Sequence, residues 1–453
     1  MSSKRSAART GQPNSLSGER SPRGTWMEAL GTLRKFHRRS ALKQAGPGVV
    51  TGAADDDPSG IATYSQAGAQ FGFDMLWTVV LSYPMMVGIQ MVSARIGRVT
   101  GQGLAANMRL LYPRWLLTGI VALLVAANTI NVAADIAAMG EALQLLVGGG
   151  QHGHAIVFGL VSLVLQVFIP YQRYVRILRW LTLSLFAYVA VVFMVRVPWE
   201  RVLVHALLPH VALERDFAMV LVAVFGTTIS PYLFFWQASQ EVEDMRAQPR
   251  AEPLLNARLA QARLHLRRIR IDTYVGMGFS NLIAFFIVLS TAVTLHAAGV
   301  HHIETSAQAA EALRPLAGDL AFLLFSLGIV GTGMLAVPVL AGSAAYAVAD
   351  CFEWRQGLDR RLGEAKRFYA IIALATLGGV ALDFTPMDPI RALLWSAVIN
   401  GVIAVPIMTV MMLMAREAKV MGPFVITRRL QVLGWLATAA MLTAVLTMLY
   451  YAR

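Results

Sequence analysis

The chain has 453 residues, of which 56% are hydrophobic and only 14% are charged. Soluble domains are usually closer to one quarter charged, so this composition excludes an ordinary soluble protein. Apolar windows of membrane-spanning length recur along the chain and predict an all-α polytopic membrane protein. The formal net charge of +13 would suggest nucleic-acid binding in a soluble protein, but here its distribution along the chain is a topology signal.

The first 44 residues form a basic tail rich in Ser, Arg, Gly and Lys. They lack the apolar core of a secretory signal, so we expect a cytoplasmic tail whose charge keeps the N-terminus inside. Contact with anionic lipid is the alternative, and residues 26–41 have the pattern of a short interfacial helix. Residues 45–453 are expected to form one transmembrane domain.

An unusual polar run interrupts the first apolar segment, at about residues 47–73. Three consecutive aspartates, Asp55, Asp56 and Asp57, are followed by Pro58 and Gly60. Each carboxylate at mid-bilayer depth costs about 2.5–3.5 kcal/mol on insertion scales, and proline and glycine weaken a helix. We therefore expect a broken helix whose freed carbonyl oxygens and carboxylates face a cavity and form a cation site. A solvated turn without a site is the alternative.

The apolar windows give eleven candidate spans. They cover residues 47–73, 75–94, 115–147, 155–171, 177–197, 217–240, 272–298, 316–350, 368–384, 390–415 and 431–451. With the N-terminus inside and the spans alternating, 33 of the 39 Lys and Arg residues fall on the inside. This separation predicts an inside N-terminus and an outside C-terminus. The Arg-rich segment 245–271 is then expected to be a solvated cytoplasmic helix joining two halves, with lipid binding or regulation as the alternative.

A second polar run interrupts the sixth span. Thr227, Thr228 and Ser230 precede Pro231 at mid-span, as the aspartates precede Pro58 in the first. Paired interruptions five spans apart indicate an inverted repeat with the binding site between its halves. We expect one repeat over about 45–200, a second over about 215–415, and an extra eleventh helix over about 430–453.

These two regions resemble the natural resistance-associated macrophage protein (NRAMP) family. The similarity is clearest over about 46–145 and 217–240. The motifs that carry it are Gly46-Pro47-Gly48, Asp57-Pro58, Gln66-Ala67-Gly68-Ala69, Ala94-Arg95-Ile96-Gly97 and Val99-Thr100-Gly101. The resemblance implies proton-coupled transport of divalent metal ions by alternating access. It also implies a LeuT-like fold of five plus five helices, with helices 1 and 6 broken and an eleventh helix added.

The chain departs from the family at several positions. The family's Asp-Pro-Gly-Asn reads Asp57-Pro58-Ser59-Gly60, so the asparagine ligand falls on Gly60, which has no side chain. The family's Met-Pro-His reads Ser230-Pro231-Tyr232, so a thioether becomes a hydroxyl and a histidine becomes a tyrosine. A family glutamate on the proton path falls on Ala138, which leaves proton coupling open.

The remaining donors predict a metal site made of oxygen atoms alone. It would use side chains or freed carbonyl groups of Ala54, Asp56, Asp57, Ser59, Thr227, Thr228 and Ser230, around the bare position Gly60, with Asp55 as a further candidate. All-oxygen sites suit Mg²⁺, Ca²⁺ or Mn²⁺, whereas the family's thioether favours manganese and iron. The chain is thus similar to the magnesium-transporting branch related to NRAMP.

Other polar residues within the spans are candidates for a proton path or for support of the site. Asp135 matches a family aspartate on the proton path; Asn131, Asn128, Tyr232 and Asn400 are further candidates. Interhelical hydrogen bonding is the alternative for each asparagine. Glu141 lies two turns beyond Asp135 on the same span, and both a functional role and interhelical hydrogen bonding stay open for it.

The leading functional hypothesis is a secondary-active transporter of divalent metal ions such as Mn²⁺ or Mg²⁺, without a bound cofactor. The alternatives are an uncoupled Mg²⁺ carrier, a channel, and a transporter of an organic substrate such as an amino acid, whose carboxylate the aspartates would repel. Hydrolase and metalloprotease motifs are absent from the sequence, so we do not expect an enzyme. The partners expected are the metal ion and the lipid bilayer, not nucleic acid, and the Ala- and Arg-rich composition favours a bacterial inner membrane.

Overall fold

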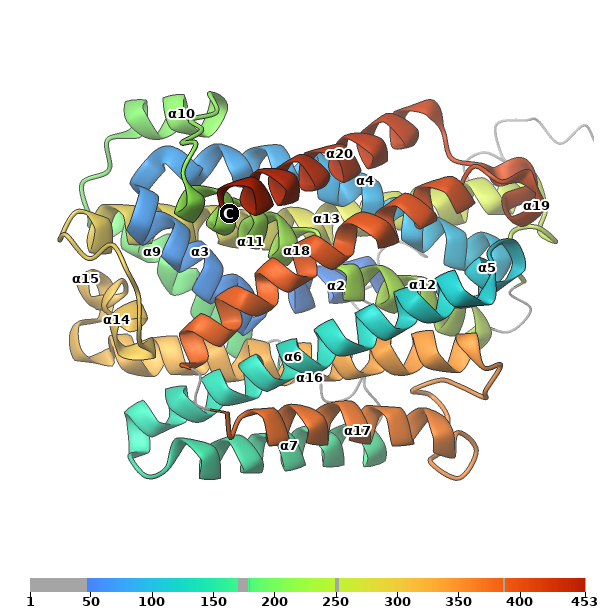
Figure 1. Ribbon diagram of the computed structural model, residues 1–453, viewed down its shortest axis with the longest axis horizontal. Helices are drawn as coiled ribbons and strands as arrows, with labels where there is room; N and C mark the ends of the chain where they lie inside the picture. Colours follow the sequence, from blue (N-terminus) through green and yellow to red (C-terminus); the bar gives the residue numbers. More distant parts are fainter. Residues whose placement is uncertain (1–46, 170–177, 179, 249–251, 386–387, 453) are drawn as a thin grey trace, which may run out of the picture. The chain divides into compact units, whose positions relative to one another are not determined.

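A computed structural model describes residues 47–169, 178, 180–248, 252–385 and 388–452 (Figure 1). Within these ranges every regular element is a helix. The predicted interfacial helix at 26–41 and the rest of the basic tail lie outside the described residues.

The helices that cross the domain correspond to the eleven expected spans. In chain order they are α2 (Pro47–Asp55) with α3 (Pro58–Phe71), α4 (Leu76–Thr100), α6 (Arg114–Val147), α7 (Gln151–Phe168), α9 (Phe186–Met194), α11 (Arg215–Thr228) with α12 (Pro231–Ala247), α13 (Leu259–Thr291), α16 (Ala321–Cys351), α17 (Lys366–Leu382), α18 (Pro389–Met414) and α20 (Arg428–Tyr451).

Eight helical stretches in the described part of the chain are long and apolar enough to cross a membrane. One of them, Pro58–Thr100, contains both α3 and α4, whereas α9 and α17 fall below that length. The segment 245–271 differs from expectation, because α12 runs on to Ala247 and α13 already begins at Leu259. The predicted joining helix is therefore wrong as a separate element, and its Arg-rich second part is the first turns of α13.

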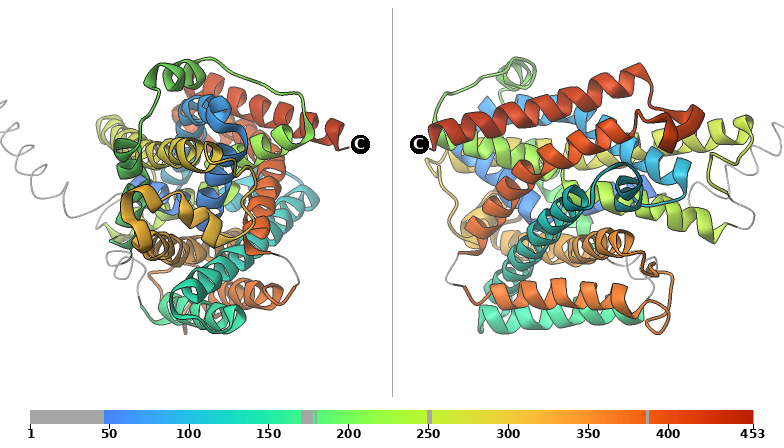
Figure 2. Two further views of the ribbon diagram at one scale, coloured as in Figure 1. Left: turned by 90° about the vertical axis from the view of Figure 1, so that its left-hand side faces the viewer. Right: turned by 45° about the vertical axis from the view of Figure 1, so that its right-hand side comes forward.

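The short helices in the described connections between the spans lie at two ends of the domain. Figure 1 shows α10 (Trp199–Leu207), α14 (Ser306–Glu311) and α15 (Arg314–Ala317) at one end, and α5 (Leu104–Leu111) and α19 (Ala418–Met421) at the other. This is the separation that the distribution of basic residues predicts. Figure 2 shows α7 and α17 running side by side, in keeping with their mutual packing.

The break in the first span lies at Asp56 and Asp57. Asp57 has an extended backbone and caps α3, where its side chain accepts a hydrogen bond from the Gly60 amide. Pro58 follows as the first helical residue, a position where its missing N–H is not needed. Proline and the aspartate cap thus end one helix and begin the next, and the break leaves the end of α2 and the start of α3 facing each other.

The sixth span breaks in a matching way. Helix α11 ends at Thr228 and α12 begins at Pro231, with Ile229 and Ser230 in non-helical conformations between them. The expectation of paired interruptions in the first and sixth spans is therefore confirmed.

Glycines let neighbouring helices approach the broken segments closely. A Cβ atom built on Gly52 of α2 would lie 2.2 Å from the carbonyl oxygen of Gly276 on α13. A Cβ atom on Gly226 of α11 would lie 2.1 Å from the carbonyl oxygen of Ala397 on α18. Contacts between small residues are typical of helix packing in membranes. They hold one half of each broken helix against an intact helix.

We predict that Gly52→Ala lowers the free energy of unfolding by roughly 1–3 kcal/mol, because the added methyl group meets a backbone oxygen that cannot rotate away. Gly119→Ala is the matched control, since Gly119 is exposed on α6 and an added Cβ meets nothing within 4 Å. Thermal unfolding of both purified variants checks this. Equal stability of the two variants would contradict the close approach of α2 and α13.

Candidate metal site at the broken helices

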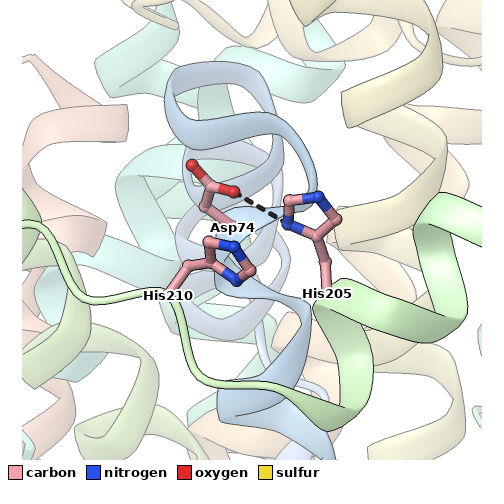
Figure 3. Close-up of side chains that lie close together, drawn as sticks. All are labelled: Asp74, His205 and His210. Atoms are coloured by element: carbon pink, nitrogen blue, oxygen red, sulfur yellow. Dashed lines mark ion pairs between the residues drawn. The ribbon is translucent and has the colours of Figure 1, made fainter.

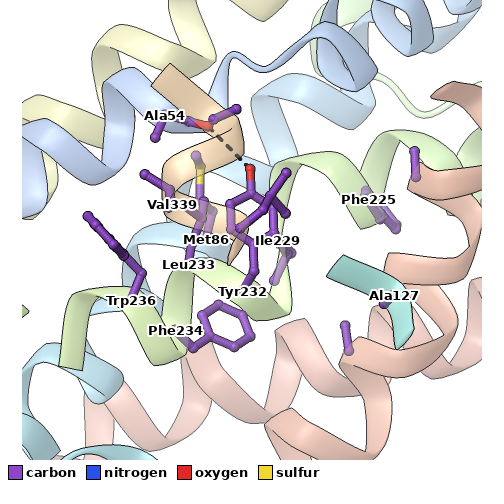
Figure 4. Close-up of a cluster of buried hydrophobic side chains, with 14 of the residues drawn as sticks. Ala54, Met86, Ala127, Phe225, Ile229, Tyr232, Leu233, Phe234, Trp236 and Val339 are labelled. Carbon is purple, nitrogen blue, oxygen red and sulfur yellow. Dashed lines mark hydrogen bonds between the residues drawn. The ribbon is translucent and has the colours of Figure 1, made fainter. Parts of the chain in front are cut away.

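The two broken helices meet at Tyr232, in the first turn of α12. Its single hydroxyl proton is shared between two acceptors, the carbonyl oxygen of Ala54 at 3.2 Å and Oδ2 of Asp57 at 3.3 Å. Figure 4 shows the Tyr232 ring reaching from α12 to the end of α2, among buried apolar side chains such as Leu233 and Val339. The predicted Ala54 carbonyl and Asp57 carboxylate are thus brought together, and apolar packing shields them from solvent.

Asp57 is the most heavily hydrogen-bonded carboxylate of the group. Its Oδ1 accepts from the Ser59 hydroxyl and the Gly60 amide, both at 2.7 Å. Its Oδ2 accepts from the Asn131 amide group at 3.2 Å as well as from Tyr232. The side chain is fixed by groups from three helices, so its position is predetermined rather than adjustable.

Asp55 and Asp56 share a partner that the sequence did not reveal. The hydroxyl of Ser280 on α13 lies 2.6 Å from Oδ2 of Asp55 and 2.9 Å from Oδ1 of Asp56. Both carboxylates are buried, and Oδ1 of Asp55 has no hydrogen-bond partner among the described residues. The next residue on α13, Asn281, instead donates to the Val79 carbonyl oxygen and links two helices.

Asp135 on α6 is the fourth buried carboxylate. Its oxygens make no well-formed hydrogen bond within the described residues, although the Ser59 amide and the Asp57 carboxylate are close enough to influence it. Asn131, one turn earlier on α6, donates to Oδ2 of Asp57. Asn128 does not belong to the group, because it donates to Leu340 and Ser343 on α16.

The hydroxyl groups of Ser230 and Thr228 lie at the break and donate to their own helix, and the Thr228 hydroxyl also lies 3.0 Å from the Tyr64 hydroxyl of α3. The single Ser230 hydroxyl proton is shared between the carbonyl oxygens of Thr227 at 2.6 Å and Gly226 at 2.9 Å. Thr228 donates to the Val224 carbonyl oxygen. Their hydroxyl oxygens keep lone pairs, but the Ser230 hydroxyl occupies two of the carbonyl groups that the break sets free.

Gly60 and Thr227 face each other across the two broken helices. A Cβ atom built on Gly60 would lie 3.2 Å from Oγ1 of Thr227 and 3.4 Å from Oδ1 of Asp57. The position where the family has asparagine is therefore directed at this group of donors. Even a single Cβ atom there would be in tight contact with the Thr227 hydroxyl oxygen, so the bare glycine lets α3 and α11 approach closely at this point.

Two other candidate residues lie apart from this group. Glu141 accepts from the backbone amide and the hydroxyl of Ser306, at the start of α14. Asn400 on α18 is buried, and its amide group has no hydrogen-bond partner among the described residues. No described contact joins Asn400 to Asp57.

The resulting charge arrangement is unusual. Asp55, Asp56, Asp57 and Asp135 are each at most 3% exposed, and within the described ranges none of them forms an ion pair. An ionised carboxylate in a dry interior is strongly disfavoured unless a cation or several donors compensate it. Oxygen donors from α2, α3 and α12, with Asp135 nearby, form an environment that suits a hard divalent cation.

A family model described as "Natural resistance-associated macrophage protein-like" matches residues 48–451. The chain belongs to the NRAMP family. It is 27% identical over 392 residues to the divalent metal cation transporter MntH of Acidiphilium cryptum, which covers 84% of each chain. It is 28% identical over 410 residues to the protein of the same name from Deinococcus radiodurans, covering 88% of this chain and 87% of the relative. These NRAMP relatives are named as transporters and not as enzymes.

Solved structures of two kinds resemble this NRAMP chain. A manganese transporter from Eremococcus coleocola matches with a TM-score of 0.69 and 16% identity, over 90% of this chain and 85% of that one. Mhp1, a nucleobase-cation-symport-1 family transporter, matches in its closed conformation with a TM-score of 0.55 and 14% identity, over 91% and 94%. At these identities the likeness shows the fold alone. It confirms the LeuT-like architecture with broken helices 1 and 6.

Proposed function

We propose that this NRAMP protein is a secondary-active transporter of divalent metal cations. The observation that carries the proposal is the set of four buried carboxylates without an ion-pair partner in the described residues. A divalent cation is the substrate that would compensate them. The names of the relatives from A. cryptum and D. radiodurans support the same substrate class.

The ion would be bound chiefly by the Asp57 carboxylate and the Ala54 carbonyl group. Asp56, the Thr227 hydroxyl and the freed carbonyl groups of the sixth span complete the set, while Ser59 and Asn131 hold Asp57 in place. All of these donors are oxygen atoms, so we infer a preference for hard ions, with Mg²⁺ and Mn²⁺ as the leading candidates. Alternating access would then open this site to each side of the membrane in turn.

Proton coupling would depend on Asp135. Tyr232 replaces the family's histidine, and a phenol does not take up a proton near neutral pH. Asp135 is an acid beside the site to which we assign no ligand role, and it is buried and without a well-formed hydrogen bond among the described residues. Internal pH followed during metal uptake distinguishes proton symport from an uncoupled Mg²⁺ carrier.

An organic substrate is the second candidate, since Mhp1 has the same fold and belongs to a nucleobase-cation symport family. The fold alone does not decide between an organic substrate and a metal ion. A substrate carboxylate would be repelled by Asp55, Asp56 and Asp57, and this electrostatic argument favours the metal ion. For the membrane itself we propose a bacterial inner membrane, with the N-terminus in the cytoplasm and the C-terminus outside, as the basic residues indicate.

We predict that Asp57→Ala abolishes metal uptake into proteoliposomes. This change also removes the cap of α3, which costs about 1 kcal/mol. Asp57→Asn is the matched variant, because an asparagine oxygen can still cap the helix but carries no charge. Both variants should lose uptake while remaining folded. Uptake at the wild-type rate by folded Asp57→Asn protein would rule out Asp57 as the metal ligand.

We predict that Ser230→Met shifts the preference from Mg²⁺ toward Mn²⁺. The change removes a hydroxyl that donates to the Gly226 and Thr227 carbonyl oxygens and introduces a soft thioether at the break. Ser230→Leu is the control, since leucine has a similar volume but no sulfur. The ratio of Mn²⁺ to Mg²⁺ uptake should rise at least several-fold in the methionine variant alone. An equal ratio in the two variants would show that ligand softness does not set selectivity.

A further inference from the structure

A second group of metal-ligating side chains lies away from the broken helices. Asp74 belongs to the short helix η1 (Gly72–Met75), His205 to α10, and His210 to the segment after α10. One ligand atom from each residue lies within 4.8 Å of the other two. Figure 3 shows the two imidazole rings and the carboxylate gathered around one point.

The three side chains are positioned by contacts with their surroundings. The rings of His205 and His210 stack with centroids 4.4 Å apart. The Trp77 indole N–H donates to the His210 carbonyl oxygen at 3.1 Å, which ties this segment to the start of α4. Nδ1 of His210 lies 3.1 Å from the Leu208 carbonyl oxygen and can donate to it only if it carries the proton. That tautomer leaves Nε2 of His210 with a free lone pair.

The contact between His205 and Asp74 also suits two side chains that bind the same metal ion. Nδ1 of His205 is 2.9 Å from Oδ1 of Asp74, yet it makes no well-formed hydrogen bond among the described residues. Two ligands of one metal ion, each about 2.1 Å from it, are about 3 Å apart when they occupy adjacent positions of an octahedron. The observed separation matches that spacing.

We infer that Asp74, His205 and His210 form a second metal site, for a borderline divalent transition-metal ion such as Zn²⁺ or Co²⁺. Two imidazoles and one carboxylate favour such ions over Mg²⁺ or Ca²⁺, in contrast with the oxygen donors at Asp57. The site is open to solvent, because His210 is exposed and the other two residues are partly exposed. Water would complete the coordination sphere.

The position of this site connects it to both broken helices. Helix η1 follows directly on α3, the second half of the first broken helix. Helix α10 and its following segment lead into α11, the first half of the sixth broken helix. A metal ion here would link these two connections, at the end of the domain that the topology predicts to be outside. Binding would therefore oppose any movement of η1 away from α10.

The test is Co²⁺ binding to purified Asp57→Ala protein, in which the site at the broken helices is disabled. Co²⁺ bound by nitrogen and oxygen ligands is detected by its visible absorption, and Zn²⁺ should displace it. We expect one Co²⁺ per chain in this background. Adding His205→Gln, or separately His210→Gln, should weaken binding about tenfold or more.

His152→Gln is the matched control. His152 also pairs with an aspartate, its Nδ1 lying 2.8 Å from Oδ2 of Asp383, but no third ligand completes that pair in the described part of the chain. Co²⁺ binding should be unchanged by this control. The inference is overturned if Asp57→Ala protein binds no Co²⁺, or if neither His205→Gln nor His210→Gln weakens binding in protein that unfolds at the same temperature. Neither result depends on whether Asp57 supports metal uptake.

Discussion

Four carboxylates buried around the broken first helix are the constraint on which the rest of the structure depends. Asp55, Asp56, Asp57 and Asp135 are held out of water without a basic side chain paired to any of them in the described ranges. The hydroxyl of Ser280, the amide of Asn131 and the phenol of Tyr232 offset part of that charge by hydrogen bonding. Neutral donors alone leave most of the negative charge of the carboxylates uncompensated, and a bound divalent cation would compensate it. We therefore regard cation binding and the stability of this region as linked.

The fold supplies this arrangement through local features that reinforce one another. Pro58 and the Asp57 cap end α2 and start α3 at one place, so the same residue shapes the break and provides its central carboxylate. Pro231 likewise starts α12 directly after the second break, and the next residue, Tyr232, reaches across to the first break. Close approaches at Gly52 and Gly226 keep α2 against α13 and α11 against α18. Under the proposed alternating access, one repeat would move against the other, and the hydrogen bonds that cross the breaks would have to change during that movement.

The sequence was most informative where local chemistry decides the structure. Three aspartates before Pro58 and three hydroxyl residues around Pro231 predicted both breaks, and the distribution of Lys and Arg predicted how the connections alternate. It was least informative about contacts made by packing. Ser280 could not be distinguished from its neighbour Asn281, because only the rotation of α13 decides which of them faces the aspartates. Likewise Ser230 is at the expected place, but whether its hydroxyl faces the site or its own helix depends on the local backbone. Asp74 is distant in sequence from His205 and His210, so only the fold brings it to the two histidines.

The most direct measurement is the position of Mn²⁺ in crystals of the protein, located by its anomalous scattering. A site at the broken helices requires an anomalous peak within about 2.0–2.6 Å of the Asp57 carboxylate, with the Ala54 carbonyl oxygen as a neighbour. The same crystals of Asp57→Asn protein should lose that peak. Strong Mn²⁺ density elsewhere in the membrane domain, with none beside Asp57 at saturating Mn²⁺, would contradict the assignment of the transport site.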